Sequence, residues 1–473
     1  MQQVLKNLIS LIIGFFGIRI ISFAATLYMT NTLGPNHFGI LSSGINLSII
    51  LSIAFNMGLD EYIIRESAKH DQSISQQLST IFALKLIFIP IGMLVLLVII
   101  FYDPSYWWLI VWMGLYSNLH SFLTVLWAYM RGIEHMKAQT LNSLLQIILI
   151  AIGTSIATWI TKDIFWIAPI YAGATGVALF FCLVDMKKIK IDIHIDFNFH
   201  LIKKTLLTAL PFGINYILLL FFDRIIIIAI TVFVGSVGVG LFTSVYNLTL
   251  ITTSIPAILI TASIPLLVRS IHEQRSDITV IASNLLRYSM ILGFLAASSI
   301  YLLTPLIIQI FSDQYAAAAT ILRILAWSLP PLFLTTVVVN ILETMGYARR
   351  SAMLVGTCFL ISMPVIMLVT WQYHLIGATW IYIAVHSFLA SVLYYELQKH
   401  LTILNPWSLF LPPGIASSMI IILTLIFPSD HILLISCFGL ISFIGILFAG
   451  GTLGKADLIV MHNLFYRKNT STV

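Results

Sequence analysis

The feature that most constrains this chain is a series of apolar runs, each about twenty residues long, which is the length of an α-helix that crosses a hydrocarbon core of about 30 Å. Inside that core every backbone polar group must be paired within the protein, which leaves only helices or a closed barrel. Barrel strands alternate apolar and polar residues over about ten positions, and these runs do not alternate. The sequence therefore predicts an all-α polytopic membrane protein.

Composition supports this class, because 59% of the 473 residues are hydrophobic and only 9% are charged, whereas soluble domains carry about 25% charged residues. The three cysteines lie in apolar runs without metal-ligand spacing and are interpreted as buried thiols. The first run contains Arg19 and is too long for a signal peptide, so we expect it to be the first span. Reading the runs between polar breaks predicts about fourteen spans, at about 8–30, 38–59, 78–101, 107–130, 139–160, 164–184, 205–234, 238–266, 282–311, 317–342, 351–371, 375–397, 408–427 and 431–450.

The positions of Lys and Arg predict the orientation of these spans. If the N-terminus is cytoplasmic, the loops and tails on that side hold eighteen of the 24 Lys and Arg residues, and the opposite loops hold only Lys162. Cytoplasmic loops are enriched in Lys and Arg, so both termini are expected to be cytoplasmic and the number of spans even. The formal net charge of +6 then reflects loops that face anionic headgroups and requires no nucleic acid partner.

An internal repeat relates the two halves of the chain at a constant offset of 201. It matches Thr30, Gly34, Gly39, Ser43, Asn46 and Leu47 with Thr231, Gly235, Gly240, Ser244, Asn247 and Leu248. An even number of helices separates the copies, which predicts parallel repeats related by an axis along the membrane normal. The expected organisation is an N-lobe at 1–184 (spans 1–6), a cytoplasmic linker at 185–204, a C-lobe at 205–400 (spans 7–12), and two final helices with a tail at 401–473. Apolar and polar residues alternate in the linker, which indicates an extended segment on the membrane surface.

Charged residues inside the expected spans are the candidate functional residues, because each costs roughly 2.5–3.5 kcal/mol at the bilayer centre unless it is solvated or paired. The repeat offset places Asp223 one turn from Arg19, and Arg287 beside the equivalent of Lys85. Cations around a shared aqueous cavity suit an anionic group such as a diphosphate, which Arg binds bidentately. The cations are Arg19, Lys85, Arg224, Arg287 and Arg323, and the anions are Asp223 and, near the end of its span, Glu343.

Structural explanations compete with this interpretation. Lys85, Arg287 and Arg323 are close enough to an interface for their side chains to snorkel. Asp223 and Arg224 are able to form an ion pair, although adjacent residues of a helix do not face each other. No phosphate-binding glycine loop, zinc-type histidine pair or nucleophile elbow is present in the sequence, so we expect transport rather than catalysis.

Short motifs resemble those of the polysaccharide flippases, the Wzx-type and polysaccharide-transporter families of the multidrug/oligosaccharidyl-lipid/polysaccharide (MOP) superfamily. Leu33-Gly34-Pro35-Asn36-His37-Phe38-Gly39 is similar to the motif after their first helix, and Gly58-Leu59-Asp60-Glu61-Tyr62 to the end of their second. Residues 131–137 resemble the motif after helix 4, and residues 211–213 with Asp223-Arg224 resemble the start of the second half. These matches follow the family's order over about residues 1–370.

The resemblance implies a MATE-like fold with two six-helix lobes that open a central cavity alternately to each side. The implied cargo is an undecaprenyl-diphosphate-linked oligosaccharide of O-antigen, teichoic acid or capsule assembly, carried from the cytoplasmic to the outer leaflet of the bacterial inner membrane. Asp223 or Glu343 is then the candidate for coupling to a proton or Na⁺ gradient, with no other cofactor. Glycan polymerase or ligase machinery is an expected partner besides the bilayer and the lipid-linked substrate.

Two other functions remain open. A MATE-like exporter of cationic drugs shares the fold, but its cavity is expected to be acidic, and the excess of intramembrane cations argues against it. A membrane glycan polymerase or transferase is expected to carry a long outer loop with catalytic groups, which this sequence lacks.

Overall fold

The computed structural model describes residues 2–67, 74–102, 106–188, 191, 197–272, 277–403, 405–426 and 432–450. Regular structure within these ranges is helical. The helices are α1 (Gln2–Asn56), α2 (Leu59–Ser67), α3 (Ile74–Tyr102), α4 (Trp107–Gly132), α5 (Met136–Thr161), α6 (Ile164–Lys188), α7 (Phe199–Phe233), α8 (Ser236–Thr252), α9 (Ser254–His272), α10 (Asp277–Gln309), α11 (Ala318–Leu325), α12 (Leu329–Thr344), α13 (Ala348–Gln398), α14 (Pro406–Ile426) and α15 (Ile432–Ala449), with short 3-10 turns η2 (Asp313–Tyr315) and η3 (Ala326–Ser328).

These helices account for the fourteen expected spans. Gly34 (φ 72°, ψ 171°) divides α1 into two straight segments, and His374 (φ 52°, ψ −140°) divides α13 in the same way. The pairs α8–α9 and α11–α12 each form one interrupted span, and α2 is too short to cross a bilayer. Within the described residues, ten helices are long and apolar enough to cross a membrane by length and composition alone. The expected class of helical polytopic membrane protein is confirmed.

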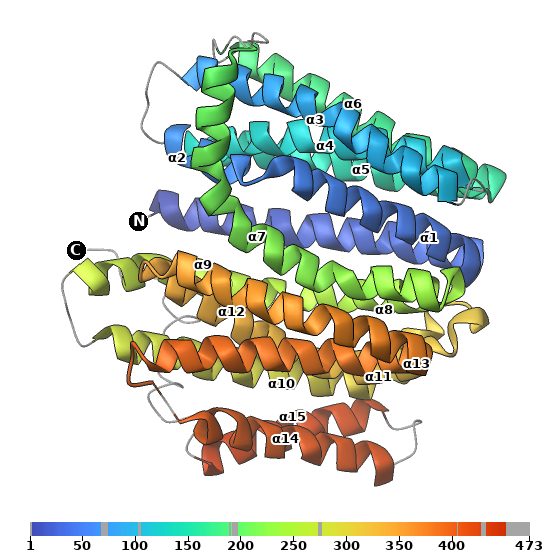
Figure 1. Ribbon diagram of the computed structural model, residues 1–473. Coiled ribbons are helices and arrows are strands. Elements are labelled where there is room, and N and C mark those ends of the chain that lie inside the picture. Colours follow the sequence, from blue (N-terminus) through green and yellow to red (C-terminus); the bar gives the residue numbers. More distant parts are fainter. Residues whose placement is uncertain are drawn as a thin grey trace. The chain divides into compact units, whose positions relative to one another are not determined.

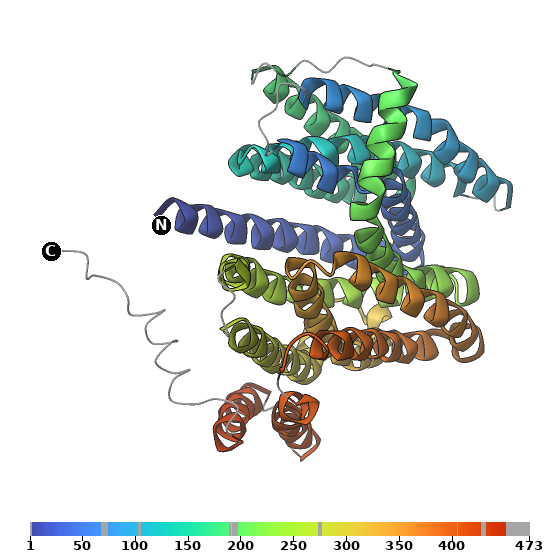
Figure 2. The same ribbon diagram turned by 60° about the vertical axis from the view of Figure 1, so that its left-hand side comes forward.

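The chain forms two compact units. Unit 1 comprises Met1–Ser254, Phe311–Ile321 and Ala348–Tyr382, and unit 2 comprises Ile255–Ile310, Leu322–Tyr347 and Ile383–Val473. In unit 1, α3, α4, α5 and α6 lie side by side, and α8 runs along α1 (Figure 1). In unit 2, α14 and α15 form a pair that packs on α10 (Figure 2). The expected division into repeat-related lobes stays a prediction, and most of the expected linker and the tail from residue 451 lie outside the described residues.

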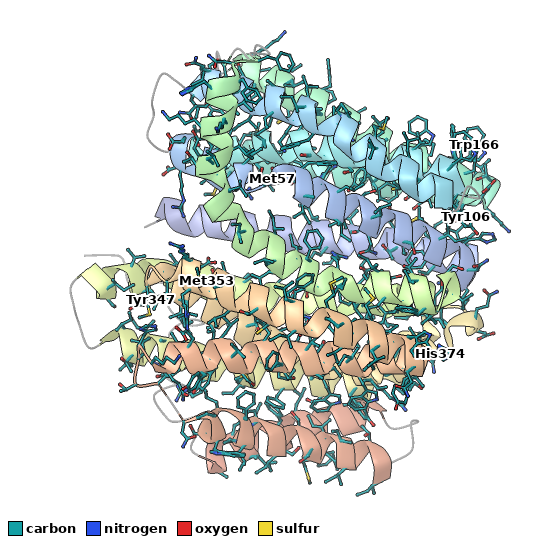
Figure 3. The ribbon with its side chains drawn as sticks, in the orientation of Figure 1. Met57, Tyr106, Trp166, Tyr347, Met353 and His374 are labelled. Carbon is teal, nitrogen blue, oxygen red and sulfur yellow. The ribbon has the colours of Figure 1, made fainter. Side chains whose placement is uncertain are left out.

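Aromatic side chains gather at one end of the helices of unit 1. Tyr106 and Trp166 lie at this end, at the start of α4 and of α6 (Figure 3). Trp108 stacks on Phe165 with ring centroids 4.6 Å apart, and its indole N–H donates to the Phe165 carbonyl oxygen at 3.1 Å. Trp and Tyr are enriched where a membrane meets water, so this end indicates one interface of the bilayer.

Two glycines that match in the internal repeat lie at turns of the backbone. Gly34 lies at the kink within α1, and Gly235 directly precedes α8. Gly34 and Gly235 are related by the offset of 201, and both have positive φ angles, of 72° and 91°. Only glycine adopts this conformation without strain. The two copies therefore share a backbone turn as well as a sequence pattern.

A second repeat-related pair, Gly39 and Gly240, lets α1 and α8 cross at backbone contact. A Cβ atom on Gly39 would overlap the carbonyl oxygen of Ser236, and one on Gly240 would overlap the carbonyl oxygen of Pro35. Small residues allow such close approach of helices in membranes, where packing rather than the hydrophobic effect drives association. Beside the crossing, the hydroxyl oxygens of Ser43 and Thr231 lie 3.3 Å apart.

We predict that Gly39→Ala destabilises unit 1, because the added methyl group separates α1 from α8. Overpacking of this kind costs about 1–3 kcal/mol, and the measurement is the melting temperature of the purified protein in detergent. Gly17→Ala is the matched control on the same helix, since a Cβ there meets no atom within 4 Å. Equal melting temperatures for the two variants would contradict this account of the crossing.

The topology is tested with single cysteines in a chain whose three native cysteines are replaced by serine. Asp163 in the α5–α6 turn and Lys187 at the end of α6 are both exposed. Because the distribution of Lys and Arg orients these two ends oppositely, we predict that Asp163→Cys reacts with an impermeant maleimide in intact cells. Lys187→Cys should react only after permeabilisation, and the reverse pattern would invert the assigned orientation.

Candidate functional site

A polar cavity of about 210 Å³ lies inside unit 1, and we refer to it as the main cavity. Two repeat-related asparagines, Asn46 and Asn247, both line it. The other lining residues are Ser22, Ala25, Thr26, Met29, Phe38, Ser42, Ile45 and Ile49 of α1, Tyr116 of α4, Ile147, Ile150 and Ala151 of α5, Tyr171 of α6, Arg224 and Ile227 of α7, and Thr243 and Tyr246 of α8. The walls are therefore a mixture of apolar side chains, hydroxyl groups and amides.

Arg224 is the one charged side chain among the described residues that line the main cavity. Its Nη1 donates to Asn46 Oδ1 at 2.7 Å, and its Cζ lies 5.9 Å from the centre of the Tyr246 ring. Its Nε is buried and has no hydrogen-bond partner. These partners are neutral, so the guanidinium keeps its charge and an unused donor, both of which favour binding of an anion.

Asp223 precedes Arg224 in α7 and contacts a different helix. The Tyr382 hydroxyl of α13 lies 3.4 Å from Asp223 Oδ1, a long contact in which the hydroxyl donates. Successive residues of a helix project in different directions. Arg224 donates to Asn46 of α1 and Asp223 accepts from Tyr382 of α13, while both lie within electrostatic range of Tyr246 of α8. Asp223 is not among the residues that line the main cavity.

Arg19 lies one turn before Ser22 on α1 and stabilises the interruption between α8 and α9. Its Nη1 donates to the carbonyl oxygen of Leu250, close to the end of α8. The last carbonyls of a helix lack partners within it and carry partial negative charge, so a guanidinium satisfies them at membrane depth. Arg19 and Arg224 both lie within electrostatic range of Tyr246.

Lys85 occupies a different buried site, between α1, α3 and α4, with only 2% of its surface exposed. Its Nζ donates to Asn56 Oδ1 at 3.0 Å, to the Ser121 carbonyl oxygen at 2.8 Å, and to Ser121 Oγ. An ammonium has three donors, and each has an acceptor here. Lys85 is therefore held inside unit 1 rather than extended to an interface, and it does not line the main cavity.

A second cavity, of about 110 Å³, adjoins the Lys85 site and is called the α2 cavity. Gly58 takes a positive φ of 81° at the turn between α1 and α2, beside Met57 (Figure 3). This turn brings two carboxylates and a guanidinium to one small space. The lining residues are Ile53, Asn56, Gly58, Asp60, Glu61, Arg131, Gly213 and Ile217.

The remaining candidates, Arg287, Arg323 and Glu343, belong to unit 2. Arg287 Nη2 lies 3.2 Å from the Tyr288 hydroxyl, and Arg323 is exposed with its Cζ 5.7 Å from the Tyr301 ring centre. Glu343 is exposed near the end of α12. Of the seven residues singled out in the sequence, the structure thus brings Arg19, Asp223 and Arg224 into one neighbourhood.

Sequence reasoning from charge alone did not single out the neutral residues of the main cavity. Asn46, Asn247, Tyr116, Tyr171 and Tyr246 supply amides, hydroxyls and a ring beside Arg224. A signal for the two asparagines was present, because they match each other at the repeat offset. For the tyrosines no such signal exists, since aromatic residues are common throughout apolar spans.

Solved structures of membrane transporters share this fold. One described as "Lipid II flippase MurJ, inward closed conformation" superposes with a TM-score of 0.67 at 13% identity, covering 96% of this chain and 98% of that one. An inward-facing multidrug resistance MATE transporter of the MOP superfamily gives 0.64 at 14% identity, covering 81% and 94%. A MOP superfamily transporter from Pyrococcus furiosus gives 0.59 at 16% identity, covering 84% and 95%. The chain is thus a multi-pass membrane protein with a MATE-like fold.

The family is shown by sequence. Residues 4–271 match the model of the family described as polysaccharide biosynthesis protein. The chain belongs to this family, as its motifs and spans had led us to expect. It matches no curated protein closely enough to count as a relative.

We predict that Lys85→Met lowers the melting temperature, since it leaves Asn56 and Ser121 with buried acceptors that lose their donor. Each unsatisfied buried group costs about 1–3 kcal/mol. Lys187→Met, at an exposed position on α6, is the matched control and should unfold like the unmodified protein. A Lys85→Met protein of undiminished stability would show that the three hydrogen bonds contribute little.

Proposed function

We propose that this chain is a flippase that moves an undecaprenyl-diphosphate-linked oligosaccharide from the cytoplasmic to the outer leaflet of the bacterial inner membrane. The diphosphate would bind Arg224 in the main cavity, and alternating access of the two lobes would carry it across. Surface glycan assembly is the process that this transport would serve, with polymerase or ligase machinery receiving the product.

The proposal depends on the Arg224 guanidinium, which contacts neutral groups and has one buried donor without an acceptor. A cation in a membrane protein is usually paired with a carboxylate or marks a substrate pathway. Arg224 has an amide and an aromatic ring as partners and a buried Nε without one. A phosphate oxygen would supply the missing acceptor and the missing negative charge together.

Family and fold support the same function. The family is described by polysaccharide biosynthesis, and a protein with the same fold is described as a flippase of lipid II. The main cavity, of about 210 Å³, is smaller than the roughly 300–1,000 Å³ of typical small-molecule pockets. It has room for a charged headgroup, and a conformational change must widen it for a sugar chain. Arg287 and Arg323, which belong to unit 2, stay candidate ligands of the headgroup.

The charge of the cavity favours an anionic cargo over the cationic drugs of a MATE-type exporter. A site for organic cations is expected to contain carboxylates or a cage of aromatic rings without a competing cation. The described lining of the main cavity contains Arg224 and no acidic side chain.

The proposal is tested in a strain that lacks the chain, complemented with variants and scored for surface glycan and for lipid-linked intermediates left inside. We predict that Arg224→Gln abolishes export and that Arg224→Lys retains part of it, because Lys keeps the charge but not the bidentate geometry. Lys187→Gln, which removes an exposed cation, is the matched control and should export normally. Normal surface glycan in the Arg224→Gln strain would overturn the assignment of the headgroup site.

A charge-neutralising variant separates binding from folding. Asn46→Asp places a carboxylate where Asn46 Oδ1 now lies 2.7 Å from Arg224 Nη1. We predict that the new ion pair leaves the melting temperature undiminished and abolishes export, since the guanidinium is no longer available to an anion. Export at the normal rate by this variant would contradict a role for the Arg224 charge.

A further inference from the structure

Asp60, in the α2 cavity, carries a carboxylate that is buried but not fully hydrogen-bonded. It is the second residue of α2, and its Oδ1 is shielded from solvent without a hydrogen-bond partner. The cavity of about 110 Å³ is large enough for several water molecules, each of which needs roughly 10–15 Å³ of such volume. The buried carboxylate of Asp60 thus borders a small cavity that has room for water.

The three hydrogen bonds of Lys85 do not involve Asp60, so a change in the charge of Asp60 does not break them. All three donors of Lys85 are satisfied by the neutral oxygens of Asn56 and Ser121. The ammonium is still close enough to act electrostatically on Asp60. When Asp60 gains a proton, Lys85 therefore keeps its three hydrogen bonds, and none of its own donors is left unpaired.

Charged side chains from two neighbouring helices act on Asp60. Helix α3 contributes Lys85, and α4 contributes Arg131, both of which favour the ionised carboxylate. The wall from α7 consists of Gly213 and Ile217, which do not titrate, and Glu61 of α2 also lines the cavity. Burial nevertheless raises the pKa of the Asp60 carboxyl above its ordinary value, because desolvation outweighs the attraction of these cations and the side-chain hydrogen bonds of Asn56 and Thr124.

The composition of the walls favours a proton over a metal cation. Hard cations take several oxygen ligands, whereas the amide oxygen of Asn56 already accepts from Lys85. Arg131 in the wall and Lys85 behind it repel a metal ion. A proton requires only the one unpartnered carboxylate oxygen.

Polar side chains extend from the Lys85 site toward the main cavity. His120 precedes Ser121 in α4 and lies within electrostatic range of Lys85. Its ring stacks on Tyr116 with centroids 5.5 Å apart, and its Nδ1 lies 3.4 Å from Gln146 Nε2. Tyr116 lines the main cavity. His120 and Tyr116 therefore lie between the Lys85 site, which adjoins the α2 cavity, and the main cavity.

We propose that Asp60 is the proton-binding group that couples this protein to a proton gradient, with Lys85 as its fixed counter-charge. The carboxylate takes a proton from water and becomes a carboxylic acid, and it later returns the proton to water in the α2 cavity. The coupling role rests on the proposed flippase function, whereas the binding of a proton does not. This assignment replaces Asp223, which accepts from Tyr382, and Glu343, which is exposed.

The test measures proton uptake by the purified full-length protein in unbuffered detergent solution when the pH is lowered from neutral to mildly acidic. We expect Asp60→Asn to take up one proton fewer per chain than the unmodified protein, at a similar melting temperature. Asp185→Asn, at an exposed carboxylate 2.8 Å from Lys188 Nζ, is the matched control and should match the unmodified protein. Equal proton uptake by a folded Asp60→Asn protein would overturn the proposal. Loss of the proton on addition of NaCl, but not of choline chloride, would also overturn it, because it would show that the site binds Na⁺.

A second arm separates this proposal from the flippase assignment. Arg224→Gln, which alters the main cavity, should keep the full proton uptake even though export is lost. In the complemented strain, Asp60→Asn should lose the sensitivity of glycan export to a protonophore, together with most of the export itself. Export by Asp60→Asn that stays high and protonophore-sensitive would refute the coupling role, whatever the cargo.

Discussion

Burial of positive charge among neutral oxygens is the constraint on which unit 1 depends. Arg19 binds a backbone carbonyl, Lys85 binds an asparagine and a serine, and Arg224 binds an asparagine. Hydrogen bonds of this kind satisfy the donors of a cation without cancelling its charge, so a positive potential persists in a medium where water cannot screen it. An ion pair at each position would be an alternative way to bury the charge, but it would leave nothing for an anion to bind.

The backbone contributes as much to this arrangement as the side chains. Gly39 and Gly240 bring α1 and α8 into contact, and this crossing forms one boundary of the region in which Asn46 and Asn247 face a common cavity. At the other end of α1, the Gly58 turn sets α2 against α7, where Gly58 and Gly213 are in backbone contact. Helix interruptions and glycine contacts thus position polar groups that would be lipid-exposed in straight, separate helices.

Much of the fold followed from sequence, because long apolar runs have few solutions in a bilayer. The helical membrane class was predictable, and the matched residues Gly34 and Gly235 both have positive φ angles. The site was less predictable. Lys85 and Arg224 look alike in a hydropathy profile, but one is enclosed by acceptors and the other borders a cavity. Whether a cation is enclosed or borders a cavity depends on contacts between distant parts of the chain, such as that of Arg224 with Asn46, 178 residues away. The spacing of residues within one helix does not reveal such contacts.

The repeat has one further consequence, through a position where its two copies differ. Arg224 corresponds at the offset of 201 to Phe23, so only one copy has a guanidinium at this position, and Arg19 of the other copy donates to the Leu250 carbonyl oxygen. If matching residues from the two segments alone lined the main cavity, a dipolar molecule would bind there equally well in two opposite orientations. Arg224, the one charged side chain in the described lining, removes this equivalence, because the negative end of a bound molecule has one favourable position. The difference between the two matching segments at this position thereby gives the main cavity a defined electrostatic polarity.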